Sequence, residues 1–209
     1  TKSNSVNGKT YANFANVSIF KLDNVITEEF EDFETEAVGW SNNTRTEVSD
    51  DGTNQVPVTN FLGRFQIGTS VNKTFSFPSY ANNEVEIEFD FYEIDTWDYE
   101  KFIVELNGEV FVEDNFIHDN HQELTDTKDT GESLQAVGTS GTDSMDGDQK
   151  FHYKLKTNLD SNGDIKVEFS TRGLVNGDFG KNQWSFAQSL NDESWGIDNV
   201  HIKVKETNK

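Results

Sequence analysis

Strict alternation of apolar and acidic residues over positions 85–91 is the feature that most limits what this chain can fold into. Val85, Ile87, Phe89 and Phe91 occupy every second position, and acidic residues fill the positions between them. Successive side chains of a β-strand point to opposite faces of its sheet. The pattern therefore predicts a strand with one buried face and one wet face.

The same period of two recurs along the chain and predicts further strands. Clear repeats lie near residues 102–106, 151–155, 165–169 and 200–204, and shorter ones near 17–19, 65–67 and 75–77. Turn signals separate these runs at Asn107-Gly108, Asn162-Gly163 and Asn176-Gly177, and the first joins two apolar runs as a tight hairpin would. No segment has a convincing helical period. We therefore expect an all-β fold, a jelly-roll-like antiparallel β-sandwich.

Length and local composition predict one ligand-binding domain over residues 1–209. All-β domains often reach this length as single units, and 17 Phe and 4 Trp supply bulky side chains for a core. Residues 1–12 are expected to be a flexible lead-in from a preceding module. The Asp-, Gly-, Ser- and Thr-rich stretch 114–150 is expected to be a long loop, ordered by calcium.

The charge balance narrows the classes of partner. The chain carries 38 Asp plus Glu against 17 Lys plus Arg, a formal net charge of -21. Nucleic acid binding needs basic patches that neutralise phosphates, and binding to an anionic membrane needs the same, so we expect no nucleic acid partner and no binding to an anionic membrane. Like charges ~4 Å apart repel by ~4 kcal/mol at an effective dielectric of about 20, so we expect bound cations to compensate the clustered acids.

Cysteine is absent, so the sequence predicts no disulfide framework and no thiolate chemistry. No apolar run approaches the ~20 residues of a membrane span. Large surface proteins of Gram-negative bacteria often lack cysteine and gain rigidity from divalent cations. We therefore expect an extracellular module at a bacterial cell surface, monomeric within a larger adhesin and not inserted in a membrane.

Two acidic clusters are the first candidate calcium sites, since Ca²⁺ takes about 6–8 oxygen ligands. In the first, over residues 28–36, Asp32 or Glu34 is predicted to meet Asp198 where the first and last strands pair; a solvated acidic face is the alternative. The second follows the clearest strand, where strict alternation would bury Glu93, so a bulge or the strand end is expected to intervene. The second set comprises Glu93, Asp95, Asp98 and Glu100.

Loop acids form the remaining candidates. Asp143, Asp146 and Asp148 are spaced by two or three residues with Gly between them, although they do not complete an EF-hand loop. The stretch 160–164 is interpreted as a β-turn, with a cation-binding loop as the alternative. Asp192 and Glu193 are a further possible contribution, with a solvated loop as the alternative. His118 and His121 lack enough additional His or Cys for zinc and are interpreted as surface histidines.

Four motifs, in order, resemble the calcium-dependent peptide-binding domain near the tip of long RTX adhesins of Gram-negative bacteria, a family of ice-binding and biofilm adhesins. The motifs are Gly39-Trp40-Ser41-Asn42-Asn43, Phe61-Leu62-Gly63-Arg64-Phe65, the run from Phe89 to Glu100, and Glu193-Ser194-Trp195-Gly196-Ile197-Asp198-Asn199-Val200. The resemblance spans about residues 30–204. It implies cell adhesion through the free C-terminal end of peptides or proteins on other cells, with bound Ca²⁺ helping to receive the terminal carboxylate.

The implied role suggests which residues bind the ligand. A carboxylate needs a cation or an arginine in a domain this acidic, and Arg64 is a candidate for bidentate contact, with an edge ion pair as its alternative role. Trp97 and Tyr99 could line the pocket or belong to the core. Asn43, in the Gly39–Asn43 motif, completes the predicted ligand-binding set.

Three rival functions remain open at this stage. A calcium-dependent carbohydrate-binding module would share fold and metal, and would stack sugars on Trp or Tyr. A jelly-roll glycoside hydrolase is suggested by Glu93-x-Asp95-x-x-Asp98, but Asp stands where a catalytic Glu belongs and no rows of exposed aromatics are evident, so we do not expect an enzyme. A structural spacer is the third rival.

Overall fold

The structure is a computed structural model of the chain, and it describes residues 5–6, 9–10, 25–47, 59–95, 97–117, 132–134, 148–173 and 193–206. Only the backbone is described in 5–6, 9–10 and 132–134, and at Asp95, Asp98, Tyr99, Ile117 and Asp148. Every strand pair among these residues is antiparallel. The predicted all-β class is confirmed.

Thirteen strands and one short 3₁₀ turn make up the described chain. They are β1 (Ser5–Val6), β2 (Lys9–Thr10), β3 (Val25–Glu31), β4 (Arg45–Glu47), β5 (Asn60–Gln66), β6 (Ser70–Ser76), η1 (Pro78–Tyr80), β7 (Glu84–Asp95), β8 (Asp98–Leu106), β9 (Glu109–Ile117), β10 (Glu132–Leu134), β11 (Asp148–Asn158), β12 (Asp164–Arg172) and β13 (Glu193–Lys205). The predicted loop 114–150 is wrong at its ends, because β9 and β11 extend into it, and β10 lies within it.

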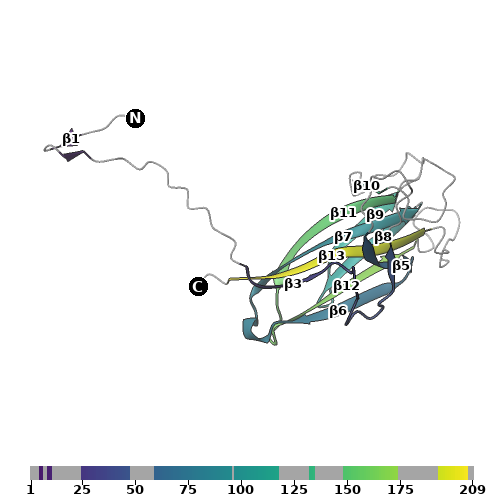
Figure 1. Ribbon diagram of the computed structural model, residues 1–209, viewed down its shortest axis with the longest axis horizontal. Helices are drawn as coiled ribbons and strands as arrows, with labels where there is room; N and C mark the ends of the chain where they lie inside the picture. The colour runs from purple at the N-terminus through teal and green to yellow at the C-terminus, as the bar shows by residue number, and fades with distance from the viewer. Residues whose placement is uncertain are drawn as a thin grey trace.

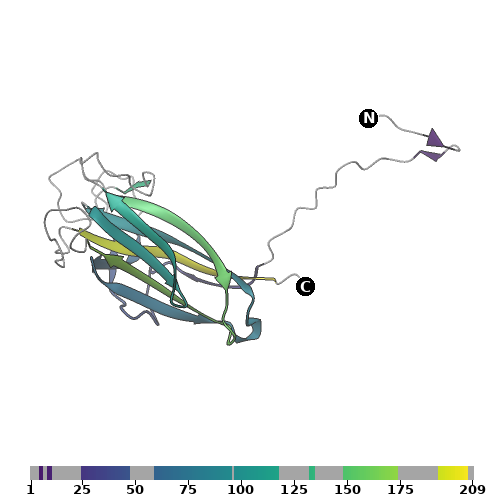
Figure 2. The same ribbon diagram turned by 180° about the vertical axis from the view of Figure 1, so that it is seen from behind.

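Two sheets form a sandwich (Figures 1 and 2). The large sheet has the order β10-β11-β7-β13-β5-β4, and β3 pairs with β13 beside β5. The small sheet has the order β6-β12-β8-β9. The β1–β2 ladder pairs with neither sheet among the described residues, and the predicted strand at 17–19 and turn at 176–177 lie outside them.

Aromatic rings fill the space between the sheets. The Phe89 ring of the large sheet packs edge-on against Phe102 and Phe169 of the small sheet, and Phe91 stacks on Phe102 with centroids 3.9 Å apart. All four of these rings are fully buried. Buried aromatic area of this size is the main favourable term in the fold, and it explains how so acidic a chain becomes compact.

The predicted turns are confirmed where the structure describes them. Asn107 and Gly108 join β8 to β9 with φ of 51° and 83°, the left-handed pair that a two-residue hairpin requires. Asp160 closes the 160–164 turn by accepting hydrogen bonds from the amides of Asn162 and Asp164 at 2.7 and 2.8 Å. The turn interpretation of this stretch therefore holds.

The strands divide the sandwich into two ends. Val25 of β3 pairs with Lys205 of β13, and Val85 of β7 pairs with Val204, so the chain enters and leaves at one end, here called the terminal pole. At the other end, here called the loop pole, Glu193 pairs with Asp95. Figure 1 shows β3 and β13 meeting at the terminal pole.

A β-bulge in β13 resets the direction of its side chains. The register with β7 passes from Asp198↔Asp90 to His201↔Glu88, so Asn199 and Val200 together stand opposite one residue. Asn199 adopts φ 52°, which Asn tolerates better than most residues. Because of the extra residue, Val200 takes a core position. Asn199 remains on the outer face next to Asp198.

Strand β7 continues where the sequence was expected to interrupt it. The predicted bulge or strand end before Glu93 is wrong: β7 pairs without a register shift from Phe91↔Ile197 to Asp95↔Glu193. Alternation therefore carries Glu93 to the core face, where it is 2% exposed. Pairing on both flanks, by β11 and β13, holds this part of the strand regular.

Gly196 is required by close packing between β5 and β13. A Cβ at this position would lie 2.2 Å from Cδ2 of Phe61. We expect Gly196→Ala to destabilise the fold by about 1–3 kcal/mol, as overpacking does, measured by urea unfolding. In a Phe61→Ala background, where the clashing ring is absent, Gly196→Ala should cost less stability than it does in the wild type. Equal losses from Gly196→Ala in both backgrounds would contradict the clash.

Candidate functional site

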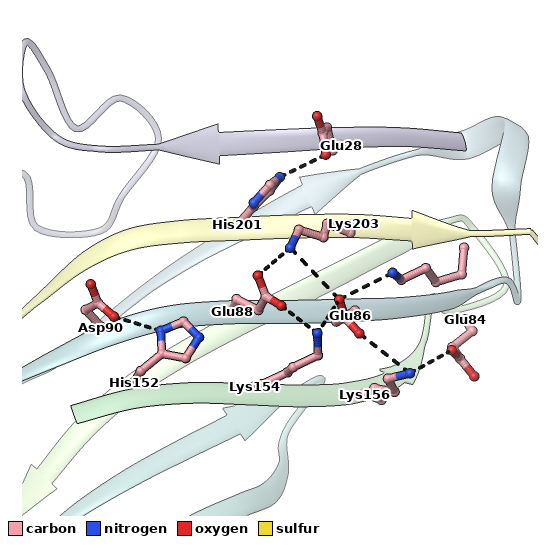
Figure 3. Close-up of polar contacts among 11 residues, drawn as sticks. Glu28, Glu84, Glu86, Glu88, Asp90, His152, Lys154, Lys156, His201 and Lys203 are labelled. Atoms are coloured by element: carbon pink, nitrogen blue, oxygen red, sulfur yellow. Dashed lines mark hydrogen bonds and ion pairs between the residues drawn. The ribbon is translucent and has the colours of Figure 1, made fainter. Parts of the chain in front are cut away.

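The outer face of the large sheet carries a ladder of opposite charges (Figure 3). Glu86 and Glu88 of β7 lie between lysines of β11 and β13. The ion pairs are Lys154 with Glu86 at 3.0 Å and Glu88 at 2.7 Å, Lys156 with Glu86 at 3.5 Å, Lys205 with Glu86 at 3.3 Å, and Lys203 with Glu88. This part of the face is internally neutralised, so the excess acid of the chain lies elsewhere.

Glu88 illustrates the strength of this ladder. Burial opposes its ionisation, but hydrogen bonds from Lys154 and Lys203, with their charges, lower the pKa of Glu88 to about 2. Because the pKa of Glu88 is lower in the folded state, its ionised form stabilises the fold at pH values above about 4.5, the pKa in the unfolded chain. This stabilisation is lost as the pH falls from 4.5 towards 2. We expect the Tm difference between wild type and Glu88→Gln to shrink over that window. Glu84→Gln, at a half-exposed site, is the control, and a constant difference would contradict the assignment.

Beyond the ladder, towards the loop pole, the β13 bulge gathers oxygen-rich side chains. Tyr92 Oη donates to Asp198 Oδ2 at 2.8 Å, and Asn199 Nδ2 donates to Asp90 Oδ2 at 2.9 Å. His152 Nδ1 lies 2.8 Å from Asp90 Oδ1 (Figure 3). Asp90, Tyr92, Asp198 and Asn199 are called the bulge cluster below. Asp198 and Asn199 are adjacent in β13, yet both reach this cluster on the outer face, because the bulge redirects Asn199.

Asp198 is a buried acid in an acidic environment. Burial, together with the charges of Asp90 and Glu34, raises the pKa of Asp198 to about 7, although hydrogen bonds from Tyr92 and the Asn199 amide act in the opposite direction. Burial and the charge of Asp198 also raise the pKa of the Tyr92 phenol. The bulge cluster therefore holds negative charge that no described cation neutralises fully.

The predicted meeting of the chain's beginning and end is confirmed for the strands. β3 pairs with β13 through Glu31↔Val200, and Glu34 follows three residues later. Glu34 accepts hydrogen bonds from Thr59 Oγ1 at 2.5 Å and from the Asn60 amide at 3.2 Å. Its charge acts on Asp198, whereas Asp32 is exposed and accepts from the Glu34 amide at 3.1 Å. Of the two predicted partners, Glu34 is the one whose charge raises the pKa of Asp198.

A second acidic group lies at the loop pole on the core face. Glu93 and Glu193 are diagonal neighbours on β7 and β13, and Glu100 is buried on β8 of the small sheet. Each is at most 3% exposed. They are called the rim carboxylates below. Burying a carboxylate costs free energy unless it is bonded or neutralised, and each of these three has an interaction partner in the fold.

The predicted ligand-binding residues occupy different places. Arg64 lies on the outer face of β5, where its Nε donates to Ser194 Oγ at 2.9 Å. Asn43 is exposed in the turn before β4. Trp97 is fully buried against Phe91 and Phe116, a position that fits the core alternative rather than a pocket wall.

Several predicted site residues fall outside the description. Asp143, Asp146 and Asp192 lie outside the described residues, as do His118 and His121. For Asp95, Asp98, Tyr99 and Asp148 the structure describes the backbone only. Sequence reasoning missed Asp90, Tyr92 and Asn199. Asp90 and Tyr92 stand in outward positions of a clear strand, which indicates a wet face and nothing more.

Calcium binding remains a prediction for this chain. Within the described residues, no three His, Cys, Asp or Glu side chains already stand close enough to hold a metal ion. The bulge cluster nevertheless offers donors of one chemical kind, carboxylate, amide and phenol oxygens, which suit Ca²⁺. The donor types therefore fit calcium, and a complete shell would need further oxygens from other residues or water.

Comparisons with known proteins identify similar folds but no family. No protein-family model and no curated protein matches the chain. Similar solved structures include latent PorU from Porphyromonas gingivalis (12% identity, TM-score 0.46, 88% of this chain and 13% of that one). Others are a family 35 carbohydrate-binding module from Clostridium thermocellum (9%, 0.39, 84% and 97%) and the K3 adhesin domain of Lys-gingipain from Porphyromonas gingivalis (14%, 0.38, 85% and 99%).

Because the identities and TM-scores are low, these likenesses do not assign the chain to any of those families. The chain also spans only 13% of the PorU chain. None of the three is an RTX peptide-binding domain, so that resemblance stays a prediction. No helix of the described residues is long and apolar enough to span a bilayer.

Proposed function

We propose that this chain is a calcium-dependent ligand-binding module of a bacterial surface adhesin that holds the free C-terminal end of a peptide on another cell. The observation that carries the proposal is the bulge cluster, which concentrates negative charge on the same outer face as Arg64. The proposal places Ca²⁺ at the bulge cluster, on Asp198 and Asp90, with its remaining ligands supplied by other oxygens or by water. A bound Ca²⁺ would supply a fixed positive charge able to receive a carboxylate.

Arg64 supports the choice of an anionic ligand. Its position beside Ser194 is near the loop pole, on the side of the sheet that also carries Asp198. An arginine and a divalent cation on one face would give a terminal carboxylate two positive contacts.

The described surface does not favour the glycan alternative. Sugar-binding faces stack their ligand on exposed aromatic rings. Among the described side chains, Phe30 is the one aromatic in the exposed class, at 55%, and it pairs with His201, on the far side of the β13 bulge from Arg64. A peptide end is therefore the better-supported ligand class in the described part of the chain.

The hydrolase alternative is also disfavoured by geometry. A Glu-x-Asp-x-Glu type of catalytic strand needs its carboxylates on one continuous strand facing an open cleft. Here Glu93 is buried on β7 of the large sheet, whereas Asp98 begins β8 of the small sheet. We therefore propose a non-enzymatic module.

A peptide screen tests the proposal directly. In calcium, peptides with free C-termini should bind, and the same peptides amidated at the C-terminus should not, as followed by fluorescence anisotropy. Arg64→Gln should weaken binding by about 10-fold to 100-fold, the range for a hydrogen bond to a charged group. Arg172→Gln, at an exposed arginine of the small sheet, is the matched control. Equal binding of free and amidated peptides would refute capture of a terminal carboxylate, and release of reducing sugar from glucans would favour the hydrolase.

A further inference from the structure

We propose that the module also bears mechanical load, and that it does so in one direction only, between the loop pole and the exit of β13 at Glu206. This inference rests on the proposed function in one respect, since that function places the ligand at the loop pole, which β11 and β13 both reach. The load path itself follows from the register of the strands.

Strand β13, from which the described fold exits, pairs with β7 on both sides of the bulge at Asn199 and Val200. β13 pairs with β7 from Val204↔Val85 to Glu193↔Asp95, and β7 in turn pairs with β11 from Asn158↔Glu84 to Gln149↔Glu93. A force that pulls β13 towards the terminal pole and β11 towards the loop pole acts along the strands. In that shear geometry the hydrogen bonds of a ladder share the force and must break together.

Side chains reinforce this ladder on both faces. On the core face Val200, Ile202 and Val204 are fully buried. On the outer face the lysines of β11 and β13 both pair with Glu86 and Glu88 of β7, so the ion pairs cross all three strands (Figure 3). Sliding one strand past the next would break these pairs while also exposing apolar surface.

A force applied between the start of β3 and the end of β13 acts on a weaker pairing of strands. Val25 and Lys205 are register partners at the same pole, so pulling them apart opens the β3–β13 ladder from its end. Hydrogen bonds in that geometry break one after another. β3 also buries little, because Val25, Ile26 and Phe30 are 39%, 40% and 55% exposed. A spacer within a stretched stalk would carry its load between the start of β3 and the end of β13. The fold therefore suits a ligand-binding domain that is loaded through its ligand better than a spacer.

Single-molecule pulling tests the load path without any ligand. The chain has no cysteine, so a pair of introduced cysteines provides unique handles. One variant carries Gln149→Cys and Glu206→Cys, and the other carries Val25→Cys and Glu206→Cys. At equal pulling speed, the first should unfold at a higher force than the second, because a force along the strands loads the perpendicular hydrogen bonds of the ladder together. Unchanged Tm of both variants without load verifies that they are folded.

A further substitution separates the ladder from general stability. Lys203→Ala should lower the unfolding force of the 149–206 pair, and it should leave the first opening step of the 25–206 pair unchanged. Equal forces for the two handle pairs, or a higher force for 25–206, would overturn the load proposal. Loss of peptide binding with unequal forces would instead count against the proposed function alone.

Discussion

Removal of calcium with EDTA is expected to lower the Tm of this protein by about 5–10 °C and to abolish peptide binding. A ligand present at a hundredfold excess over its Kd stabilises the folded state by about 2.7 kcal/mol, and a domain of this size loses about 2–4 °C of Tm per kcal/mol. The physical reason is the uncompensated charge of the bulge cluster, where Asp90 and Glu34 both act on the buried Asp198. Calorimetry in EDTA and after return of excess calcium measures the effect.

The ionic strength must be matched with NaCl, because a chain of net charge -21 responds to any salt. Asp160→Asn provides a matched acid-to-amide control, since Asp160 closes a turn and lies outside both acidic groups. That variant should keep the full response to EDTA, whereas a variant of Asp198 should lose most of it. Unchanged melting of the wild type in EDTA at matched ionic strength would remove the metal from the proposal.

The strands of the sandwich were predictable because each has one buried face. The 85–91 alternation requires no knowledge of the neighbours, since period two follows from the pleat alone. The pairing of the first and last long strands was anticipated from the acids on both, although alternation alone cannot specify which strands become neighbours. β10 was not anticipated, because its three residues carry no periodic signal of their own.

The site was predicted less well than the fold, for a specific physical reason. Glu93 falls in phase with the buried apolar residues of its strand, which predicts a bulge before it. Strand β7 instead stays regular and buries Glu93. The bulge occurs instead in β13, where the apolar alternation changes phase from Trp195 and Ile197 to Val200, Ile202 and Val204. Asp90 and Tyr92 become site residues because β7 lies beside the part of β13 that carries Asp198 and Asn199. The partner of a strand cannot be read from that strand's own pattern.

Asp198→Asn is expected to have effects of opposite sign with and without calcium. In EDTA the raised pKa of the Asp198 carboxyl, about 7, means that the folded state binds its proton more tightly than the unfolded state does. Wild-type stability should therefore fall as pH rises from about 4 to 7, and the amide removes that loss. At pH 8 the variant should be more stable than wild type by about 2–4 kcal/mol, because one pKa unit corresponds to about 1.4 kcal/mol.

With saturating calcium the order should reverse, because the bound cation favours the ionised Asp198 and an amide oxygen is the weaker ligand. Urea unfolding of both proteins at pH 5 and pH 8, each with calcium and with EDTA, gives the four comparisons. Asp160→Asn again serves as the control, since backbone hydrogen bonds lower the pKa of the Asp160 carboxyl and its loss should destabilise the fold in either medium. A variant that is less stable than wild type at pH 8 in EDTA would contradict the uncompensated charge at Asp198. A variant that keeps its advantage in calcium would show that no cation is held there.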